Sequence, residues 1–365
     1  MNITKSSLAC TLLAALATLS APALATNWSD RIRISGFASA NYHATDDPTS
    51  FDGPVNEGHD NKGSFGGTRV GLQIDAKVND QFRFAAQLFS SKKEDYIMEA
   101  DWAFGTLRLG DNLDLRAGKL KFPGGLVNEY ISVGYATPWM HAPAVIYTEL
   151  GAPNGPQMTR ESYSGISLLG RQDTDDWAFE ADLFTGELEL AGSYVRKLRG
   201  ATLRADWDDT MLFQVTGYSG VMMGVEDIAD APGMAANMEG ENHRALLYGF
   251  KADWNDIVVY AEKGRVEMAD LSMMKADSWY TTVGYRIGKL LPTVTYESYK
   301  QGAGSMQEDQ QNTTTLGLRW DYIRNVALKF EISRIKTEKG FGLFPQNSTP
   351  DASVNMFGFG IDTVF

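Results

Sequence analysis

The feature of this sequence that most limits its fold is a long segment without a regular period inside an otherwise strand-like chain. Residues 113–121 alternate in the manner of a strand, and Pro123 ends that pattern. From 120 to 161 the chain is rich in proline and aromatic residues and shows neither helical nor strand periodicity. A compact soluble domain leaves the backbone polar groups of such a segment unsatisfied. A wide, water-filled barrel removes the difficulty, because the segment can fold inward between water and a polar wall.

The N-terminal residues 1–25 are organised like an export signal. A basic start precedes the apolar run 8–19, and residues 23–25 fit an A-x-A cleavage site. The single cysteine, Cys10, lies inside this segment, so residues 26–365 contain no thiol. A chain without thiols suits an oxidising periplasm. We expect a cleaved signal peptide at 1–25 and a single barrel domain at 26–365.

Composition limits the class of protein further. Of the 365 residues, 22% are charged. After the N-terminus there is no apolar run of roughly 18 residues, which excludes a helical membrane protein but leaves a β-barrel open, because strand signals are weak. The formal net charge is -13, and it becomes -14 without Lys5, so we expect no nucleic-acid partner.

Short runs with a period of two recur along the chain from Arg31. The clearest lies at 68–78, where the apolar side chains of Val70, Leu72 and Ile74 alternate with polar ones such as Gln73. Because successive side chains of a strand point to opposite faces, one face is apolar and the other polar. This pattern fits a wall with lipid on one side and water on the other.

Two classes of connection take turns along the chain. Short ones, rich in turn-forming residues, lie at 79–80, 110–112, 173–176, 208–209, 255–256, 288–289 and 322–325. Longer polar ones lie at 45–67, 92–95, 120–161, 188–198, 221–242, 269–275, 301–311 and 337–352. Seven short turns and eight loops separate sixteen strands, and an even number puts both termini on the short-turn side. The predicted fold is an all-β transmembrane antiparallel barrel of 16 strands whose long third loop folds into the lumen.

Five aromatic residues with apolar-face parity lie close to the short turns: Trp177, Trp207, Trp254, Tyr285 and Trp320. They indicate an aromatic girdle at one membrane interface. The alternative is that they are core residues of a soluble β-sandwich, which gives no reason for them to gather beside one class of turn. The last strand, 354–365, alternates and ends on Phe365.

In architecture the chain resembles the Gram-negative outer-membrane porins. The local motifs that resemble the third loop of general and phosphate-selective porins are 115–120, Phe122-Pro123, 133–135 and Pro138-Trp139. The resemblance implies a cell outer-membrane location, a homotrimer, and recognition of the terminal aromatic residue by the barrel-assembly machinery. One departure is the second loop at 91–95, which is very short, whereas in general porins it holds a neighbouring subunit.

Inward charges are the candidate site residues. The pore-lining basic set is Arg33, Arg69, Arg83 and Arg116, and the loop facing it carries the acidic residues Glu129 and Glu149. Two opposed rows of charge across a narrow aperture favour small polar solutes over apolar ones. The alternative is that the arginines only keep the lumen soluble and pair locally with Asp75, Asp101 or Glu99.

The function expected from these features is passive diffusion of small hydrophilic or ionic solutes across the outer membrane. The alternative is a closed barrel with a structural or surface-receptor role. No histidine belongs to a catalytic triad or a H-E-x-x-H arrangement, so we expect neither an enzyme nor a cofactor. The acidic loop 45–60 lacks EF-hand spacing, so we expect no metal site. The alternative is that this loop bridges to lipopolysaccharide through divalent ions. The other expected partner is outer-membrane lipid.

Overall fold

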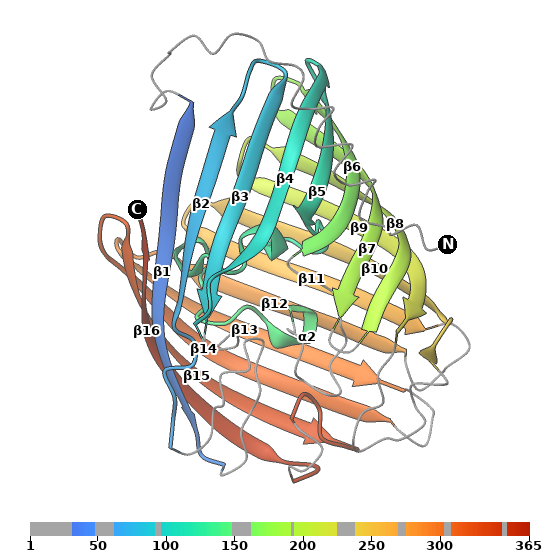
Figure 1. The fold of residues 1–365 in the computed structure, drawn as a ribbon. Coiled ribbons are helices and arrows are strands. Elements are labelled where there is room, and N and C mark those ends of the chain that lie inside the picture. Colours follow the sequence, from blue (N-terminus) through green and yellow to red (C-terminus); the bar gives the residue numbers. More distant parts are fainter. Residues whose placement is uncertain are drawn as a thin grey trace.

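The sheet closes on itself into a barrel (Figure 1). This computed structural model describes residues 31–47, 62–91, 96–147, 162–190, 193–224, 238–268, 275–302, 308–344 and 349–365. Sixteen antiparallel strands follow each other around the barrel in chain order. The predicted sixteen-stranded, all-β antiparallel barrel is confirmed. Within the described ranges, no helix combines the length and apolar character needed to cross a membrane.

The strands are long and the helical turns short. The strands are β1 (Ile32–Thr45), β2 (Arg69–Lys77), β3 (Phe82–Ser91), β4 (Glu99–Gly110), β5 (Leu113–Lys121), β6 (Ser162–Asp173), β7 (Trp177–Leu190), β8 (Ser193–Trp207), β9 (Met211–Met223), β10 (Asn242–Trp254), β11 (Ile257–Met268), β12 (Ala276–Tyr285), β13 (Leu290–Gln301), β14 (Asp309–Ile323), β15 (Val326–Glu338) and β16 (Ser353–Val364). Between β5 and β6 lie η3 (Asn128–Tyr130), η4 (Gly134–Ala136) and α2 (Ala144–Tyr147).

The last strand closes the barrel against the first. β1 and β16 pair antiparallel from Phe37, opposite Val364, onward. The terminal residue takes part, because the amides of Gly36 and Phe365 each donate to the other residue's carbonyl oxygen at 2.9 Å. A closed sheet leaves no strand edge with unpaired backbone groups, which is the condition for crossing a bilayer with strands.

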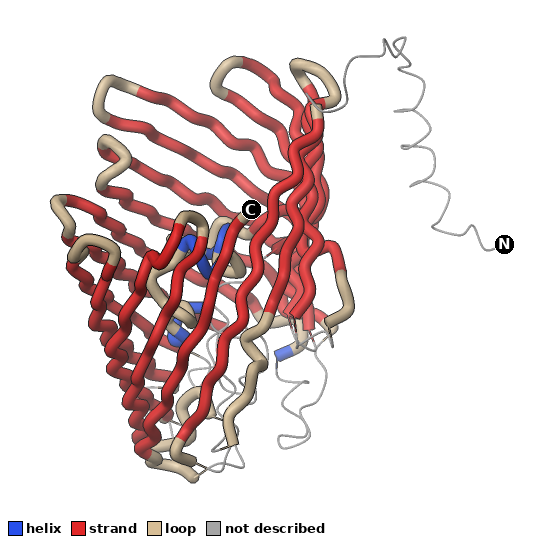
Figure 2. Tube along the Cα trace, turned by 90° about the vertical axis from the view of Figure 1, so that its left-hand side faces the viewer, coloured by secondary structure: helices blue, strands red, loops and turns tan. Residues whose placement is uncertain are grey.

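All seven short connections join neighbouring strands where the sequence predicts them. In two of them both central residues have positive φ: Asp208 (53°) with Asp209 (55°), and Asn255 (46°) with Asp256 (68°). Positive φ at both positions is the mark of a type I′ turn, whose twist matches that of the flanking strands. Asn and Asp tolerate this conformation better than other side chains do. Figure 2 shows the tight turns together at one end of the barrel.

One predicted loop is wrong. The sequence predicts a long loop at 188–198, but β7 and β8 extend into this stretch from both sides and remain paired. Leu188 pairs with Val195 across a shift in register. Both side chains and that of Leu198 are at most 1% exposed, and burying such apolar surface is favourable. The bulge hides this pairing from a search for period two, because it places two residues of one strand opposite one of the other.

The outer face of the barrel is apolar. Large side chains on it are more than half exposed, including Leu183, Leu203, Val294, Leu316 and Ile332. The neighbouring positions in sequence point the other way and are buried, for example Thr202 beside Leu203 and Thr315 beside Leu316. So much exposed apolar surface suits contact with lipid rather than water.

The five aromatic residues near the short turns lie on this outer face. Their exposed fractions run from 36% for Trp177 to 54% for Tyr285. Trp177 and Trp207 are direct cross-strand partners on β7 and β8. The sandwich-core alternative is therefore wrong, since a core aromatic residue would be buried.

The inner face is polar only in part. Towards the loop ends of β7 to β16 it carries apolar and aromatic side chains that join one buried cluster with the β5–β6 segment. Its members include Tyr218, Leu247, Val266, Tyr280, Tyr299, Ile335, Leu343, Phe344 and Val354. Along these strands the interior is packed. Inward side chains nearer the short turns, such as Arg33 and Arg171, are exposed.

The predicted signal peptide at 1–25 lies outside the described residues. It stays a prediction, as does the domain boundary at residue 26.

Replacing Leu72 in β2 by arginine tests the assignment of the two faces. Leu72 lies on the apolar row, so Leu72→Arg should cost roughly 2–4 kcal/mol near the middle of the bilayer. Gln73 lies on the opposite row and donates to Asp75 at 3.0 Å. In Gln73→Arg the new side chain can still donate to the Asp75 carboxylate, so the free energy of unfolding should change little. Equilibrium unfolding by urea in lipid vesicles measures both values, and equal costs would contradict the assignment.

Candidate functional site

The four predicted pore-lining arginines do not form one group. The side chain of Arg33 is 78% exposed and pairs with Asp75 at 3.4 Å, which is the local partner considered from the sequence. Arg83 is also exposed. Arg69 is buried and interacts electrostatically with Asp362 of β16.

Arg116 lies in a separate polar network with β6 and β7. Its Nη2 atom contacts Oδ2 of Asp182 at 2.5 Å and donates to Oγ of Ser167 at 2.8 Å. Asp182 is 2% exposed, so this ion pair is held away from bulk water. Asp101, which the sequence offered as a local partner, accepts a hydrogen bond from Gln87 at 2.8 Å.

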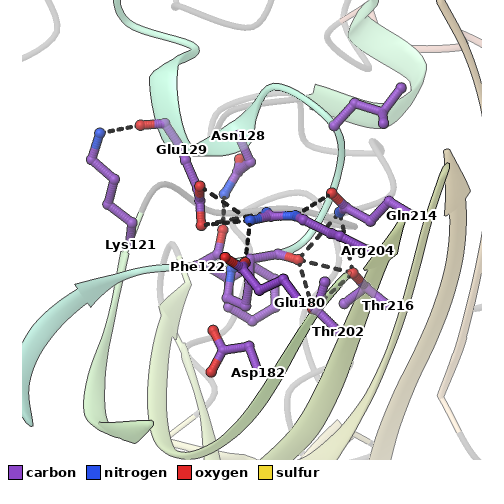
Figure 3. A network of polar contacts seen from close by, with 12 residues as sticks. Lys121, Phe122, Asn128, Glu129, Glu180, Asp182, Thr202, Arg204, Gln214 and Thr216 are labelled. Carbon is purple, nitrogen blue, oxygen red and sulfur yellow. Dashed lines mark hydrogen bonds and ion pairs between the residues drawn. The ribbon is translucent and has the colours of Figure 1, made fainter. Parts of the chain in front are cut away.

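Arg204 of β8 is the centre of the neighbouring network (Figure 3). Its Nη1 atom donates to Oε1 of Glu180 at 2.9 Å and to both carboxylate oxygens of Glu129 at 3.4 Å. Its Nε atom donates to Oε1 of Gln214 at 2.8 Å. The planar guanidinium thus meets three acceptors, a geometry that lysine does not offer. One of the acceptors, Glu129, comes from the β5–β6 segment and the other two from the barrel wall.

Glu129 is the predicted acidic residue that reaches a positive cluster. Its backbone carbonyl oxygen accepts a hydrogen bond from Nζ of Lys121. Burial acts to raise the pKa of Glu129, but the charges of Arg204, Arg116 and Lys121 outweigh it and hold the pKa below its ordinary value. The carboxylate is therefore ionised at neutral pH. The other predicted acid, Glu149, lies outside the described residues.

The start of the β5–β6 segment is tied to the wall beside this network. The carbonyl oxygen of Pro123 accepts hydrogen bonds from Thr202 of β8 at 3.0 Å and from Thr216 of β9 at 2.9 Å. Proline carries no N–H, so its carbonyl is its only backbone polar group, and here it is fully used. Phe122 packs edge-on against Tyr218 with ring centroids 5.1 Å apart.

Three buried glutamates of the wall hold backbone amides of the same segment. They lie on β11, β13 and β15, and each accepts at least one N–H. The pairs are Leu126 with Glu262 (2.7 Å), Met140 with Glu331 (2.8 Å) and Val145 with Glu297 (3.4 Å). A segment without regular structure thus finds in the wall the acceptors that a helix or sheet would supply.

Lys329 of β15 holds carbonyl groups in the same way. Its Nζ atom donates to the carbonyl oxygens of Gly134 and Trp139 at 2.6 Å and pairs with Asp362 at 2.9 Å. The side chains of Lys329 and Asp362 are each 1% exposed, so each charge is balanced by the other inside the protein and not by water. A Cβ on Gly134 would approach Oδ1 of Asp362 to 2.1 Å, so no other residue fits this position without displacement.

The aromatic residues that the sequence expects to hold this segment differ in burial. Trp139 and Tyr147 are at most 2% exposed, and the Trp139 ring lies 4.8 Å from that of Tyr260. Tyr130 packs against the buried cluster. Tyr135 instead lies 4.9 Å from the guanidinium of Arg319, a cation–π contact.

Sequence reasoning missed several residues of this site. Arg204, Glu180 and Asp182 have polar-face parity in the sequence, which was the available signal. Their pairing depends on the register of β6, β7 and β8 and on where the β5–β6 segment passes, and neither can be read from a local pattern.

The described residues contain no group of three or more His, Cys, Asp or Glu arranged to hold a metal ion. In the acidic loop 45–60, Asp46 accepts a hydrogen bond from the amide of Asn355 at 2.7 Å. Three other acids of that loop, Asp52, Glu57 and Asp60, lie outside the described residues.

Comparison with solved structures shows the fold. OmpT, an outer-membrane protein of Vibrio cholerae, is 12% identical, with a TM-score of 0.59 over 92% of this chain and 97% of that chain. The outer-membrane channel DcaP of Acinetobacter baumannii is 10% identical, with a TM-score of 0.58 and the same coverage. Salmonella typhi OmpF, in complex with daunomycin, is 15% identical, with a TM-score of 0.52 and again the same coverage.

No family model and no curated protein matches the sequence. At these identities the likeness shows the fold alone. The chain has the fold of Gram-negative outer-membrane barrels, which agrees with the predicted location and with the resemblance to porins.

The lowered pKa of Glu129 gives a pH-dependent contribution to stability. A carboxyl group with a folded-state pKa below its unfolded value stabilises the fold above the unfolded value, and the contribution is lost as pH falls through the folded value. We expect Glu129→Gln to lower the free energy of unfolding at pH 7 and to have a smaller effect at pH 2. Urea unfolding followed by tryptophan fluorescence measures this difference. A difference that is the same at both pH values would contradict the ionised pairing with Arg204.

Proposed function

We propose that this protein is a channel of the outer membrane for passive diffusion of small hydrophilic solutes. The observation that carries the proposal is a pair of neighbouring charged networks on the inner face of a sixteen-stranded barrel: Arg116 with Asp182, and Arg204 with Glu129 and Glu180. Barrels with this number of strands are wide enough for an aqueous channel. The proposal that the protein is a channel and not an enzyme rests on these same two observations, the charged inner face and the width of the barrel.

The proposal includes a third loop that lies in the lumen and narrows it. In support, the segment 122–147 contacts side chains of strands on both sides of the barrel. It binds Thr202 of β8 and Glu262 of β11 near one end, and Lys329 of β15 near the other. These side chains belong to the row opposite the exposed apolar one, so a single segment reaches all of them from the interior.

Selectivity would come from charge at the narrow point. Arg116 and Arg204 present positive charge beside Asp182 and Glu180 on the wall, and Glu129 on the loop opposes them. Opposed charges across a water-filled gap produce a transverse field that orients dipolar solutes and disfavours apolar ones. The exposed Arg33 and Arg83, nearer the short turns, would attract anions on their way through, and Arg69 would act only through Asp362.

Conductance tests the function directly. The purified protein should produce single-channel steps in a planar lipid bilayer. Deleting residues 133–145 should leave the barrel assembled, because no strand loses a partner, and should raise conductance by widening the aperture. Retention of the folded, heat-modifiable band in gel electrophoresis is the control for assembly. A deletion variant with unchanged conductance would place the narrow point elsewhere.

Replacing Arg204 tests the site. Arg204→Ala removes one positive charge and leaves Glu129 and Glu180 without that partner, so selectivity should move toward cations. Arg265→Ala is a matched control, because Arg265 also pairs with a carboxylate, that of Asp277 at 2.8 Å, but its position in β11 belongs to the row of side chains that faces outward. The reversal potential in a potassium chloride gradient measures the shift. Equal reversal potentials for the two variants would mean that the network of Arg204 only stabilises the wall.

A second candidate is the closed barrel with a structural or receptor role. The observation in its favour is the buried cluster along β7 to β16, which occupies interior space that a wide pore leaves to water. Absence of any conductance step from correctly folded protein would support this candidate and overturn the first.

The proposed assembly is a homotrimer in contact with lipid and lipopolysaccharide. One OmpT structure of the same fold is described as a trimer form. On the outer face of β1, β3 and β4, small half-buried side chains such as Ala38, Ala40, Ala86 and Ala103 allow a flat surface to approach closely. Native mass spectrometry in detergent distinguishes a trimer from a monomer.

A further inference from the structure

A polar cavity lies apart from the Arg204 network, at the short-turn end of the barrel. Its volume is about 320 Å³, at the lower end of the range of roughly 300–1,000 Å³ that is usual for ligand sites. Inward side chains of β8 to β14 form its wall, and Tyr135 and Pro138 of the β5–β6 segment border it. The cavity therefore lies on the inner side of the barrel wall.

Two of its basic residues are already neutralised. Arg286 binds Asp253 through two hydrogen bonds of 2.8 Å each. Arg319 donates from Nε to Oδ1 of Asp321 at 2.9 Å and from Nη1 to the carbonyl oxygen of Tyr135 at 2.6 Å. These pairs use their charges within the wall and fix its shape.

Three further charged residues line the cavity without such a partner: Lys251, Asp206 and Asp209. The ammonium group of Lys251 lies 5.6 Å from the centre of the Tyr260 ring. The carboxylate of Asp253, which interacts electrostatically with Lys251, is already held by Arg286. Asp206 on β8 lines the same cavity. In the part of the chain that the structure describes, none of Lys251, Asp206 and Asp209 forms an ion pair.

The register separates Lys251 and Asp206 by one strand. Leu212 of β9 pairs with Asp206 on one side and with Lys251 on the other. Neighbouring strands lie about 4.8 Å apart, so the Cα atoms of Asp206 and Lys251 are roughly 10 Å apart. Leu212 forms an apolar floor between a negative and a positive end, and Leu291 adds to the apolar lining.

We propose that this cavity binds small zwitterionic solutes whose ammonium and carboxylate groups are several ångströms apart, with short peptides as the representative class. The carboxylate pairs with Lys251, the ammonium with Asp206, and the side chains lie over Leu212. A solute with only one charge gains one contact and meets repulsion from the other end of the cavity. Both groups remain partly exposed to water, so binding is weak, as release along a diffusion path requires. The inference rests on the proposed channel function for its physiological meaning.

Calorimetric titration of the detergent-folded protein with L-alanyl-L-alanine tests the proposal. The N-acetylated and the C-amidated forms of the same dipeptide serve as probes with one charge. We expect each to bind about tenfold more weakly than the zwitterion, a difference of about 1.4 kcal/mol. Lys251→Gln and Asp206→Asn should each weaken binding of the zwitterion by a similar factor. Lys251→Gln should bind the zwitterion no more tightly than the C-amidated form, and Asp206→Asn should bind it no more tightly than the N-acetylated form.

Lys77→Gln is the matched control. Lys77 is an inward lysine at the short-turn end of β2, where it pairs with Asp80 at 2.7 Å, and it does not line the cavity. This variant should bind the dipeptide as the unmodified protein does. Equal binding of all three dipeptide forms, no binding at all, or unchanged affinity in both folded cavity variants would overturn the proposal. The titration measures binding and involves no transport. If the protein binds the dipeptide but shows no conductance, the binding proposal stands and the proposed channel function is wrong.

Discussion

The structure depends on the pairing of every strand with two neighbours. In a bilayer no water is available for exposed backbone groups, so a sheet that crosses it must close. The final contact of this closure is between Gly36 and Phe365, where the terminal residue completes the ladder of β1 and β16. Once the sheet is closed, alternate side chains point either into the barrel or outward, and apolar residues such as Leu203 and Leu316 lie on the outer face.

The same requirement governs the segment between β5 and β6. It has no regular structure to pair its own amides and carbonyls, and much of it is buried. Glu262, Glu297 and Glu331 accept its N–H groups, while Lys329 donates to its carbonyls. Burying these four ionisable groups is costly in isolation and is offset because each one makes hydrogen bonds to the segment's backbone. The wall of the barrel thus performs for this segment the role that a partner strand performs elsewhere.

The interior of the barrel has an apolar, packed part and a polar, charged part. Along β7 to β16 the loop ends are filled by apolar and aromatic side chains, whereas the network around Arg204 and the exposed arginines near the short turns keep a polar surface. In the proposed channel, a solute would be confined to the polar side. The position of a few charges, rather than the net charge of the chain, would then decide which solutes pass.

The number of strands, the short turns and the outer aromatic residues could be predicted from the sequence, because period two and turn chemistry are local properties. The loop at 188–198 could not, since a bulge breaks the period just where Leu188 and Val195 are buried together. Of the predicted site residues, Glu129 lies in the β5–β6 segment, but its partner Arg204 lies 75 residues away and meets it only after the barrel closes. The sequence alone determines which side chains face inward; the tertiary structure decides which inward charges meet, because that depends on strand register and on the course of the buried segment.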